Sequence, residues 1–186
     1  MSFVSFVIAA IMVLITPGPT NTILAASGAA MGWRRAMVLP VAEAAGYLVA
    51  VTAYLLLVQS FADVAAAMPV MKGIAAVWLL FSAWKLWNQP VNAIATERSA
   101  ALLRVFMTTL LNPKAMLVGA LLIPAMSPEL RSGAVASFLC LSLIAGAVWT
   151  VCGSSLPKAV RPHAYRLAAV VIGLFSLMAA SSAIAG

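Results

Sequence analysis

The sequence predicts an all-α integral membrane protein whose six transmembrane helices form a three-plus-three inverted repeat. Of the 186 residues, 65% are hydrophobic and only 8% are charged, whereas soluble domains carry about 25% charged residues. The long apolar runs show no two-residue alternation, which excludes a membrane β-barrel. At roughly 20 residues per span, the chain is long enough for six spans and leaves no length for a soluble catalytic domain.

Six apolar segments supply the expected spans, all within one membrane domain of residues 1–186. They cover about residues 2–24, 37–58, 64–84, 104–124, 133–156 and 167–184. The first three segments make up one half of the repeat, residues 1–87, and the last three make up the other, residues 104–186. Residues 88–103 form the only long polar connection, which we expect to be a cytoplasmic linker.

The first half of the chain combines apolar runs with a few polar interruptions. No acidic or basic residue precedes Arg34, so the first segment lacks the basic region of a signal peptide and is expected to be retained. This segment is broken near its middle by TPGP, residues 16–19. The second segment contains Glu43, the only carboxylate well inside an expected span. Lys72 lies near the start of the third segment and Lys85 lies at its end.

The second half repeats one feature of the first. Its first segment is also broken by a proline, at Asn112 and Pro113, and carries Lys114 close to its middle. An odd number of spans turns the second half upside down relative to the first, and many secondary transporters are built from such inverted repeats. The matching proline breaks therefore favour this architecture.

The distribution of basic residues predicts the orientation in the membrane. The first, third and fifth loops hold eight of the eleven basic residues: Arg34, Arg35, Lys85, Arg98, Arg104, Lys158, Arg161 and Arg166. The second and fourth loops hold only Lys72 and Arg131, and the tails hold none. Cytoplasmic loops of membrane proteins are enriched in Lys and Arg. We therefore expect both termini to lie outside, and we attribute the net charge of +7 to topology and lipid headgroups rather than to nucleic acid.

The two proline breaks are the first candidate sites. Pro17 and Pro19 flank Gly18, and prolines remove backbone donors and block a regular helix, which frees carbonyl and amide groups. At membrane depth, free backbone is tolerated only inside protein or beside a cavity, and half-helix ends can bind a carboxylate or a cation. The alternative interpretation is a simple kink or turn.

Lys114 and Glu43 are the second pair of candidates. A lysine in the middle of a span costs roughly 2.5–3.5 kcal/mol on insertion scales, so Lys114 indicates either a functional site or a structural pairing with carbonyls. Glu43 could carry a proton, pair with Lys114, hold a substrate ammonium or simply stay neutral. If the first helices of both halves meet at the midplane, Lys114 would lie beside both breaks, with Glu43 facing it.

The remaining polar residues allow two interpretations or favour no site. Asn21 follows the first break and Asn112 precedes Pro113, so each amide either satisfies freed backbone or contacts substrate. His163, the only histidine, is expected in a solvated loop, and no metal site is expected because a metal ion would need partner ligands.

Two motifs resemble those of the LysE/RhtB family of bacterial amino-acid exporters, and the resemblance extends over nearly the whole chain. TPGPTN (residues 16–21) matches the signature after the first apolar run, and LNPKA (residues 111–115) matches that of the fourth helix. The segment KGIAAVWLLFSAW (residues 72–84) looks like the third helix of the family. Some family glycines are replaced here, for example by Ala36 and Ala42, and Glu43 is not part of the family pattern.

The resemblance implies a secondary transporter that exports an amino acid or a similar small metabolite across the bacterial inner membrane. It implies no enzyme activity and no cofactor. The expected partners are the lipid bilayer, the small-molecule substrate, a coupling ion such as H⁺ and, as one possibility, a second copy of the chain. The implied substrate site comprises Pro17, Gly18, Pro19, Asn21, Glu43, Asn112, Pro113 and Lys114.

Other functions remain open at this point. A channel, an accessory membrane subunit, or an exporter of another solute such as a metal cation would have a similar composition. An intramembrane enzyme is disfavoured, because no nucleophile–base set and no carboxylate pair lies within the spans. The sequence contains no nucleotide-binding loop, so it offers no support for ATP-driven pumping.

Overall fold

The structure of the protein is a computed structural model that describes residues 1–60, 64–88 and 98–184. The described residues are helical and contain no β-strand, which confirms the all-α class. The helices are α1 (Phe3–Ile15), α2 (Pro19–Met31), α3 (Trp33–Ala36), α4 (Leu39–Ser60), α5 (Val64–Trp87), α6 (Arg98–Leu110), α7 (Pro113–Leu117), the π-helix η2 (Val118–Leu122), α8 (Pro128–Ser154), the 3-10 helix η3 (Arg161–His163) and α9 (Ala164–Ile184).

Several of these segments have the length and composition of membrane spans. Within the described part of the chain, three continuous segments qualify, Trp33–Val58, Pro128–Ser154 and Ala164–Ile184. Two bent pairs also qualify if each counts as one span: α1 with α2, bent by 55°, and Ser99–Leu110 with Pro113–Leu122, bent by 41°. Helix α5 lies where the third span is expected but is not among these segments. The protein therefore has three to five candidate spans, and the sixth span and the inverted repeat stay predictions.

Several helices extend beyond the limits expected from hydropathy. The first bent pair continues to Met31 instead of ending near residue 24, and α8 begins at Pro128 instead of near residue 133. Helix α6 begins at Arg98, inside the expected linker, and the linker residues 89–97 lie outside the described residues. Hydropathy marks the apolar part of a helix, whereas its ends carry polar residues such as Glu129 and Arg131.

The two bends have local causes in the sequence. Gly18 has extended backbone angles (φ −167°, ψ 174°), and Pro19 starts α2 at a position where a missing amide proton costs nothing. At the second bend, Asn112 is the N-cap of α7, where its side-chain oxygen accepts a hydrogen bond from the Lys114 backbone amide at 3.0 Å. Pro113 follows as the first residue of α7. Each break thus ends one helix and begins the next.

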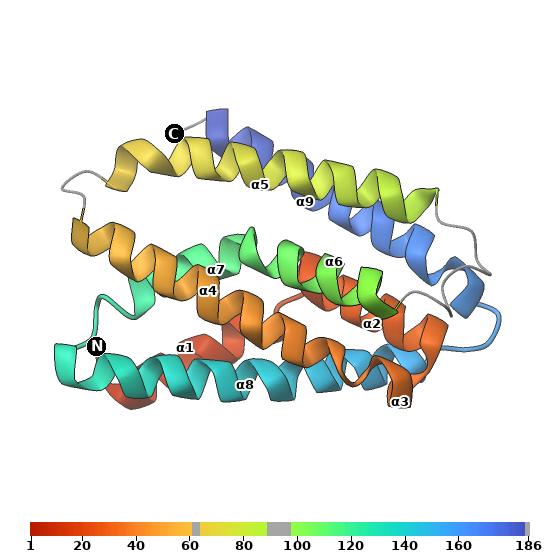
Figure 1. Ribbon diagram of the computed structural model, residues 1–186, viewed down its shortest axis with the longest axis horizontal. Coiled ribbons are helices and arrows are strands. Elements are labelled where there is room, and N and C mark those ends of the chain that lie inside the picture. Colours follow the sequence, from red (N-terminus) through yellow and green to blue (C-terminus); the bar gives the residue numbers. More distant parts are fainter. Residues whose placement is uncertain (61–63, 89–97, 185–186) are drawn as a thin grey trace.

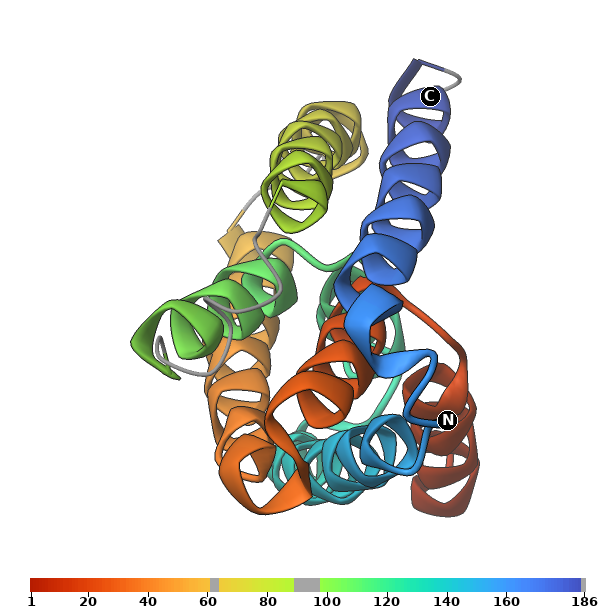
Figure 2. The same ribbon diagram turned by 90° about the vertical axis from the view of Figure 1, so that its right-hand side faces the viewer.

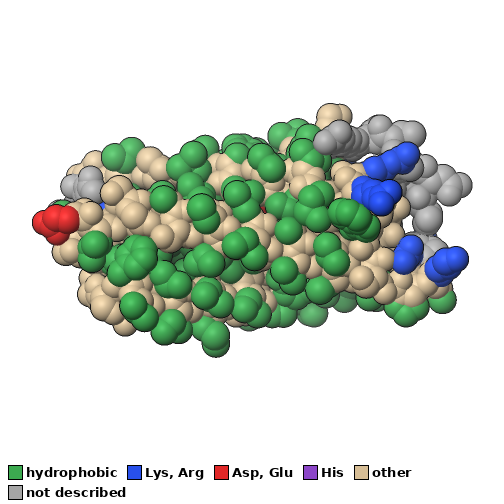
Figure 3. Space-filling view, turned by 90° about the horizontal axis from the view of Figure 1, so that it is seen from below, with side chains coloured by type: hydrophobic (Ala, Val, Ile, Leu, Met, Phe, Trp, Pro, Cys, Tyr) green, Lys and Arg blue, Asp and Glu red, His purple; other side chains and the backbone are tan. Residues whose placement is uncertain are grey.

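The long helices run along the longest axis of the molecule (Figure 1). Helix α1 begins and α9 ends at one end, which we call the terminal end. Helices α3 and η3 lie at the opposite end, which we call the basic end because Lys and Arg side chains gather there in Figure 3. The first and fifth connections therefore share one end of the molecule, opposite both termini.

Two apolar clusters form the core, one toward each end. The basic-end cluster includes Leu24 of α2, Leu79 of α5, Val105 of α6 and Ile172 of α9. The terminal-end cluster is built from α1, α4, α7, η2 and α8, with Phe6, Leu14, Tyr47, Val118 and Phe138 among its members. Among the described side chains, α5 and α9 contribute only to the basic-end cluster. These two helices pack along each other, and Figure 2 shows them on one side of the bundle.

Helices α2 and α8 cross at very close range. A Cβ atom on Gly28 would overlap with the Thr150 carbonyl, and one on Gly153 would overlap with the Ala25 carbonyl. Both obstacles are backbone atoms of the facing helix, which cannot rotate away. Small residues allow helix backbones to approach in this way in membranes. The crossing fixes α2, and with it the first break, against α8.

Candidate functional site

The two proline breaks contact each other in the structure. The Lys114 ammonium, from the start of α7, donates a hydrogen bond to the Thr16 carbonyl at the end of α1. The Lys114 side chain also crosses Gly18, because a Cβ atom at position 18 would lie 2.9 Å from its Cε and 3.2 Å from its Nζ. Lys114, Thr16 and Gly18 therefore form one local group, although 98 residues separate Lys114 from Thr16.

Two buried asparagines hold this group together. The Asn21 amide donates to the Leu14 carbonyl at 2.9 Å and to the Thr16 carbonyl at 3.0 Å, which satisfies the end of α1. The Asn112 amide donates to the Thr20 hydroxyl at 2.9 Å and so links the two breaks. Both asparagines are almost completely buried. In this structure, therefore, the amides bond to the protein, which is the first of the two interpretations offered by the sequence.

The prolines lie at different depths in the group. Pro19 is buried, whereas Pro17 and Pro113 are exposed on the outer side of the breaks. Next to them is an open pocket of about 250 Å³ lined by Val13, Thr16, Pro113, Lys114 and Leu117. Among the described residues of this lining, the lysine is the only charged one, so the pocket presents one cation between apolar walls.

The polar group forms a layer between the two apolar clusters. Along the first bent pair, Leu14 belongs to the terminal-end cluster and Ile23 to the basic-end cluster, with Thr16, Thr20 and Asn21 between them. The second bent pair crosses the layer in the opposite direction, because Val105 belongs to the basic-end cluster and Ala115 to the terminal-end cluster, with Asn112 between them. Thus the polar residues lie near the middle of the long axis, away from both ends.

Glu43 lies close to this layer but is not paired with Lys114. The Glu43 side chain is 1% exposed, and its Oε2 atom has no hydrogen-bond partner. Its carboxyl group is directed at Gly146 of α8, where an added Cβ atom would overlap with Oε2. Lys114 and Glu43 interact electrostatically, but among the described residues no ion pair joins them. Direct pairing with Lys114, one of the roles that the sequence left open for Glu43, is thus not seen in this conformation, in which the Thr16 carbonyl accepts the lysine.

Three residues of the site had no distinguishing signal in the sequence. Thr20 and Thr109 carry hydroxyl groups that lie 3.3 Å apart and connect α2 to α6. Gly146 of α8 faces the Glu43 carboxyl group. Each belongs to a residue type that is common in membrane helices, and only the packing of distant segments gives it a role.

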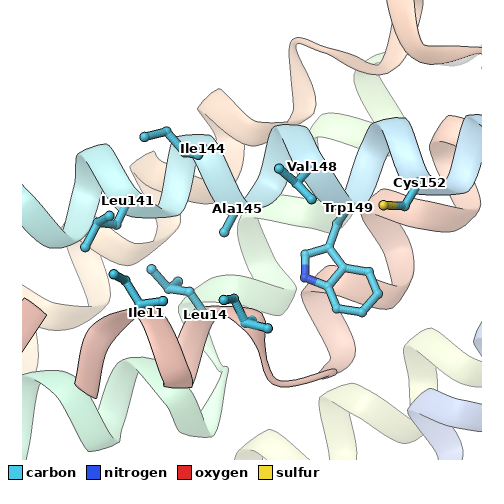
Figure 4. A pocket seen from close by; sticks show the side chains of 9 residues that line it. Ile11, Leu14, Leu141, Ile144, Ala145, Val148, Trp149 and Cys152 are labelled. Carbon is cyan, nitrogen blue, oxygen red and sulfur yellow. The ribbon is translucent and has the colours of Figure 1, made fainter. Parts of the chain in front are cut away.

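A second and larger pocket lies between α1 and α8 (Figure 4). Its volume is about 400 Å³, and its wall consists of apolar side chains that include Ile11, Leu14, Val148 and Trp149. None of the described residues of this wall carries a charge that would orient a zwitterion. This pocket is suited to hydrocarbon, so we do not place a polar substrate there.

Metal ligands do not gather in the described part of the chain, where no three His, Cys, Asp or Glu side chains come together. Comparison with known protein families, curated proteins and solved structures gives no match to this chain. The candidate site is therefore assigned from its own geometry and chemistry.

Proposed function

We propose that the protein is a secondary transporter that exports an amino acid or a similar small metabolite across the bacterial inner membrane, driven by an ion gradient. One observation carries the proposal: two broken helices, far apart in the sequence, meet at a lysine in a polar layer between two apolar clusters. Broken helices that meet at the midplane are the usual way in which secondary transporters build a substrate site.

The chemistry of the layer is suited to a solute with a carboxylate. The Lys114 ammonium opens onto the pocket beside Pro113, and its one hydrogen-bond partner among the described residues is the Thr16 carbonyl. A substrate carboxylate would replace a neutral acceptor with a charged one, and hydrogen bonds between charged groups are the stronger kind. The Thr16 carbonyl, once released, would be available for a substrate ammonium. The Asn21 amide continues to hold the end of α1 in place.

The separation of the core into two clusters supports alternating access to this layer. Helices α5 and α9 are joined to the remaining helices at the basic end, where Tyr165 donates to the Ser27 hydroxyl at 3.2 Å. Among the described side chains they take no part in the terminal-end cluster. We interpret this conformation as closed toward the basic end and open toward the terminal end. If the basic end is cytoplasmic, as its Lys and Arg content favours, this is the outward-facing state.

Reconstituted protein provides the test of this function. Purified protein in liposomes loaded with one labelled amino acid at a time should give saturable efflux that responds to an imposed pH gradient. Counterflow, in which an outward gradient of unlabelled solute drives the transient accumulation of label inside, would separate a carrier from a channel. Efflux of a metal cation, with no movement of any amino acid, would contradict the proposed substrate class. Absence of all solute movement would favour an accessory subunit.

A further inference from the structure

Two buried polar groups that are not part of the lysine site lie one helical turn apart on α4. They are Glu43 Oε2 and the Tyr47 hydroxyl, and both lack a hydrogen-bond partner. The Tyr47 side chain is fully buried, and its ring packs edge-on against Phe138 of α8 at a centroid distance of 5.0 Å. Buried polar atoms are almost always paired, so two orphans on one face of a helix need an explanation.

The surroundings of the Glu43 carboxyl group are apolar on two sides. A Cβ atom added to Gly146 would overlap with Glu43 Oε2. The same atom would lie 3.1 Å from Pro40 Cβ and 3.4 Å from Leu24 Cδ1. Gly146 therefore provides the room for the carboxyl group. An ionised carboxylate without a bonded partner is very costly in such surroundings, whereas the neutral acid is tolerated.

In the part of the chain that the structure describes, few charged or titratable groups surround Glu43. Tyr47 on the same helix and Lys114 on α7 interact with it electrostatically. Of the elements packed against α4, α2 contributes Leu24, and α8 contributes Gly146 while its cysteines are exposed. Arg104 of α6 interacts electrostatically with Tyr165 of α9. Two oxygen atoms beside a lysine cannot form the six or more oxygen ligands that a hard cation such as Ca²⁺ takes, so the ligand that fits is a proton.

We propose that Glu43, in the niche formed by Gly146, Pro40 and Leu24, is the proton-binding site that couples transport to the proton gradient. One proton binds to the carboxylate and leaves the acid neutral in the conformation seen here. The same proton returns to water when the niche opens. Its loss would create an anion near Lys114, which would then compete with the substrate carboxylate for the ammonium. The coupling part of this inference rests on the proposed function, whereas proton binding itself does not.

Infrared spectroscopy of the purified protein tests proton binding without any substrate. At neutral pH, where an ordinary carboxyl group is ionised, the wild type should show the C=O stretching band of a protonated acid, and the band should disappear reversibly at higher pH. Glu43→Gln should lack this band. Glu129→Gln is the matched control and should keep it, because Glu129 is exposed at the start of α8. A wild type without the band, or a band that survives in Glu43→Gln, would overturn the proposal.

A second pair of variants tests the niche. Gly146→Ala places a methyl group against Glu43 Oε2 and should shift the pH at which the band disappears. Gly133→Ala on the same helix is the control, because the added methyl group meets only an ordinary contact at 3.7 Å and should leave this pH unchanged. An unchanged midpoint in folded Gly146→Ala would refute the assignment of the proton to this niche.

Coupling is tested in liposomes with a labelled amino acid that the wild type transports. Glu43→Gln should retain counterflow but lose accumulation driven by a pH gradient. Normal pH-driven accumulation in this variant would refute the coupling role. If no solute is moved even by the wild type, the proposed function and the coupling role both fail, while the infrared result still decides proton binding.

Discussion

Lys114 is accommodated by its neighbours in the structure and is also the residue that we propose binds the substrate. A lysine in the middle of a membrane span is costly, and here the Thr16 carbonyl and the absence of a side chain at Gly18 accommodate it. The Thr16 carbonyl already accepts from Asn21, so it does not depend on the lysine. The lysine can therefore leave this acceptor for a better one without leaving an orphaned carbonyl behind.

Replacing Lys114 tests this interpretation directly. Lys114→Ala should lower the initial efflux rate at least about tenfold, because a hydrogen bond to a charged group contributes about 1.5–3 kcal/mol. Lys114→Arg should not restore the rate, since a planar guanidinium is not equivalent to a compact ammonium. Rates are compared at equal membrane abundance. Lys72→Ala, which removes a lysine bonded to the Ser182 carbonyl, is the control and should transport normally. Near-normal efflux by Lys114→Ala would exclude it from the substrate site.

Gly18 should be as sensitive as the lysine. Its backbone angles are accessible to any residue, so a substitution acts only through the space it fills. Gly18→Leu should push Lys114 away from the Thr16 carbonyl and abolish efflux, while the protein still reaches the membrane. The matched control is Gly73→Leu, because a Cβ atom there meets nothing within 4 Å. Equal efflux rates for the two variants would show that the lysine does not need its place over Gly18.

The candidate site could be predicted from the sequence only in part. Prolines and a mid-span lysine are conspicuous in an apolar chain, and the repeat of a broken first helix suggested that the breaks meet. The residue that makes room for the Glu43 carboxyl group was not predictable, because Gly146 lies on α8 and resembles every other small residue of that helix. The same holds for the Asn112–Thr20 bond, which depends on the exact height at which two distant helices cross.

At the scale of the helices, hydropathy located the apolar segments but not the residues at which the helices begin and end. The six expected segments all fall on helices, because apolar runs of this length leave few alternatives. The start of α8 shifted because the polar residues Glu129 and Arg131 belong to the helix, and the end of α2 shifted because small residues continue it to Met31. Arg131 and Arg161 illustrate a further pattern. Each folds back onto the carbonyls five and seven residues earlier and closes the turn before it.

The crossing of α2 and α8 should control stability rather than transport chemistry. Gly153→Ala would drive a methyl group into the Ala25 carbonyl, and Gly28→Ala would do the same at Thr150. Overpacking costs about 1–3 kcal/mol and sometimes more, so the thermal unfolding midpoint in detergent should fall by several degrees. Gly133→Ala, on the same helix as Gly153 but in ordinary contact, should leave the midpoint nearly unchanged. Equal midpoints for Gly153→Ala and Gly133→Ala would mean that the helices separate freely.

At the scale of the whole molecule, the described side chains form two apolar clusters, one toward each end. Helix α9 contributes five buried residues to the basic-end cluster, Ala164, Tyr165, Ala168, Ala169 and Ile172, all in its first half. Its second half packs on α5, for example through the Ser176 hydroxyl and the Ala76 carbonyl. Among the described side chains, the α5–α9 pair therefore joins only the basic-end cluster, so the rocking motion of our proposed transport cycle would turn about the basic end.

This asymmetry predicts which side of the membrane reaches the lysine site. In a background with Cys140→Ser and Cys152→Ser, a cysteine at Leu117, in the wall of the lysine pocket, should react with a membrane-impermeant thiol reagent added on the side of the termini. It should react slowly from the other side. A cysteine at Ala83, buried in the basic-end cluster, is the control and should be protected from both sides. Faster labelling of the Leu117 cysteine from the side of α3 would mean that the open end has been assigned wrongly. A substrate that closes the terminal end should slow the labelling, and Lys114→Ala should remove that protection.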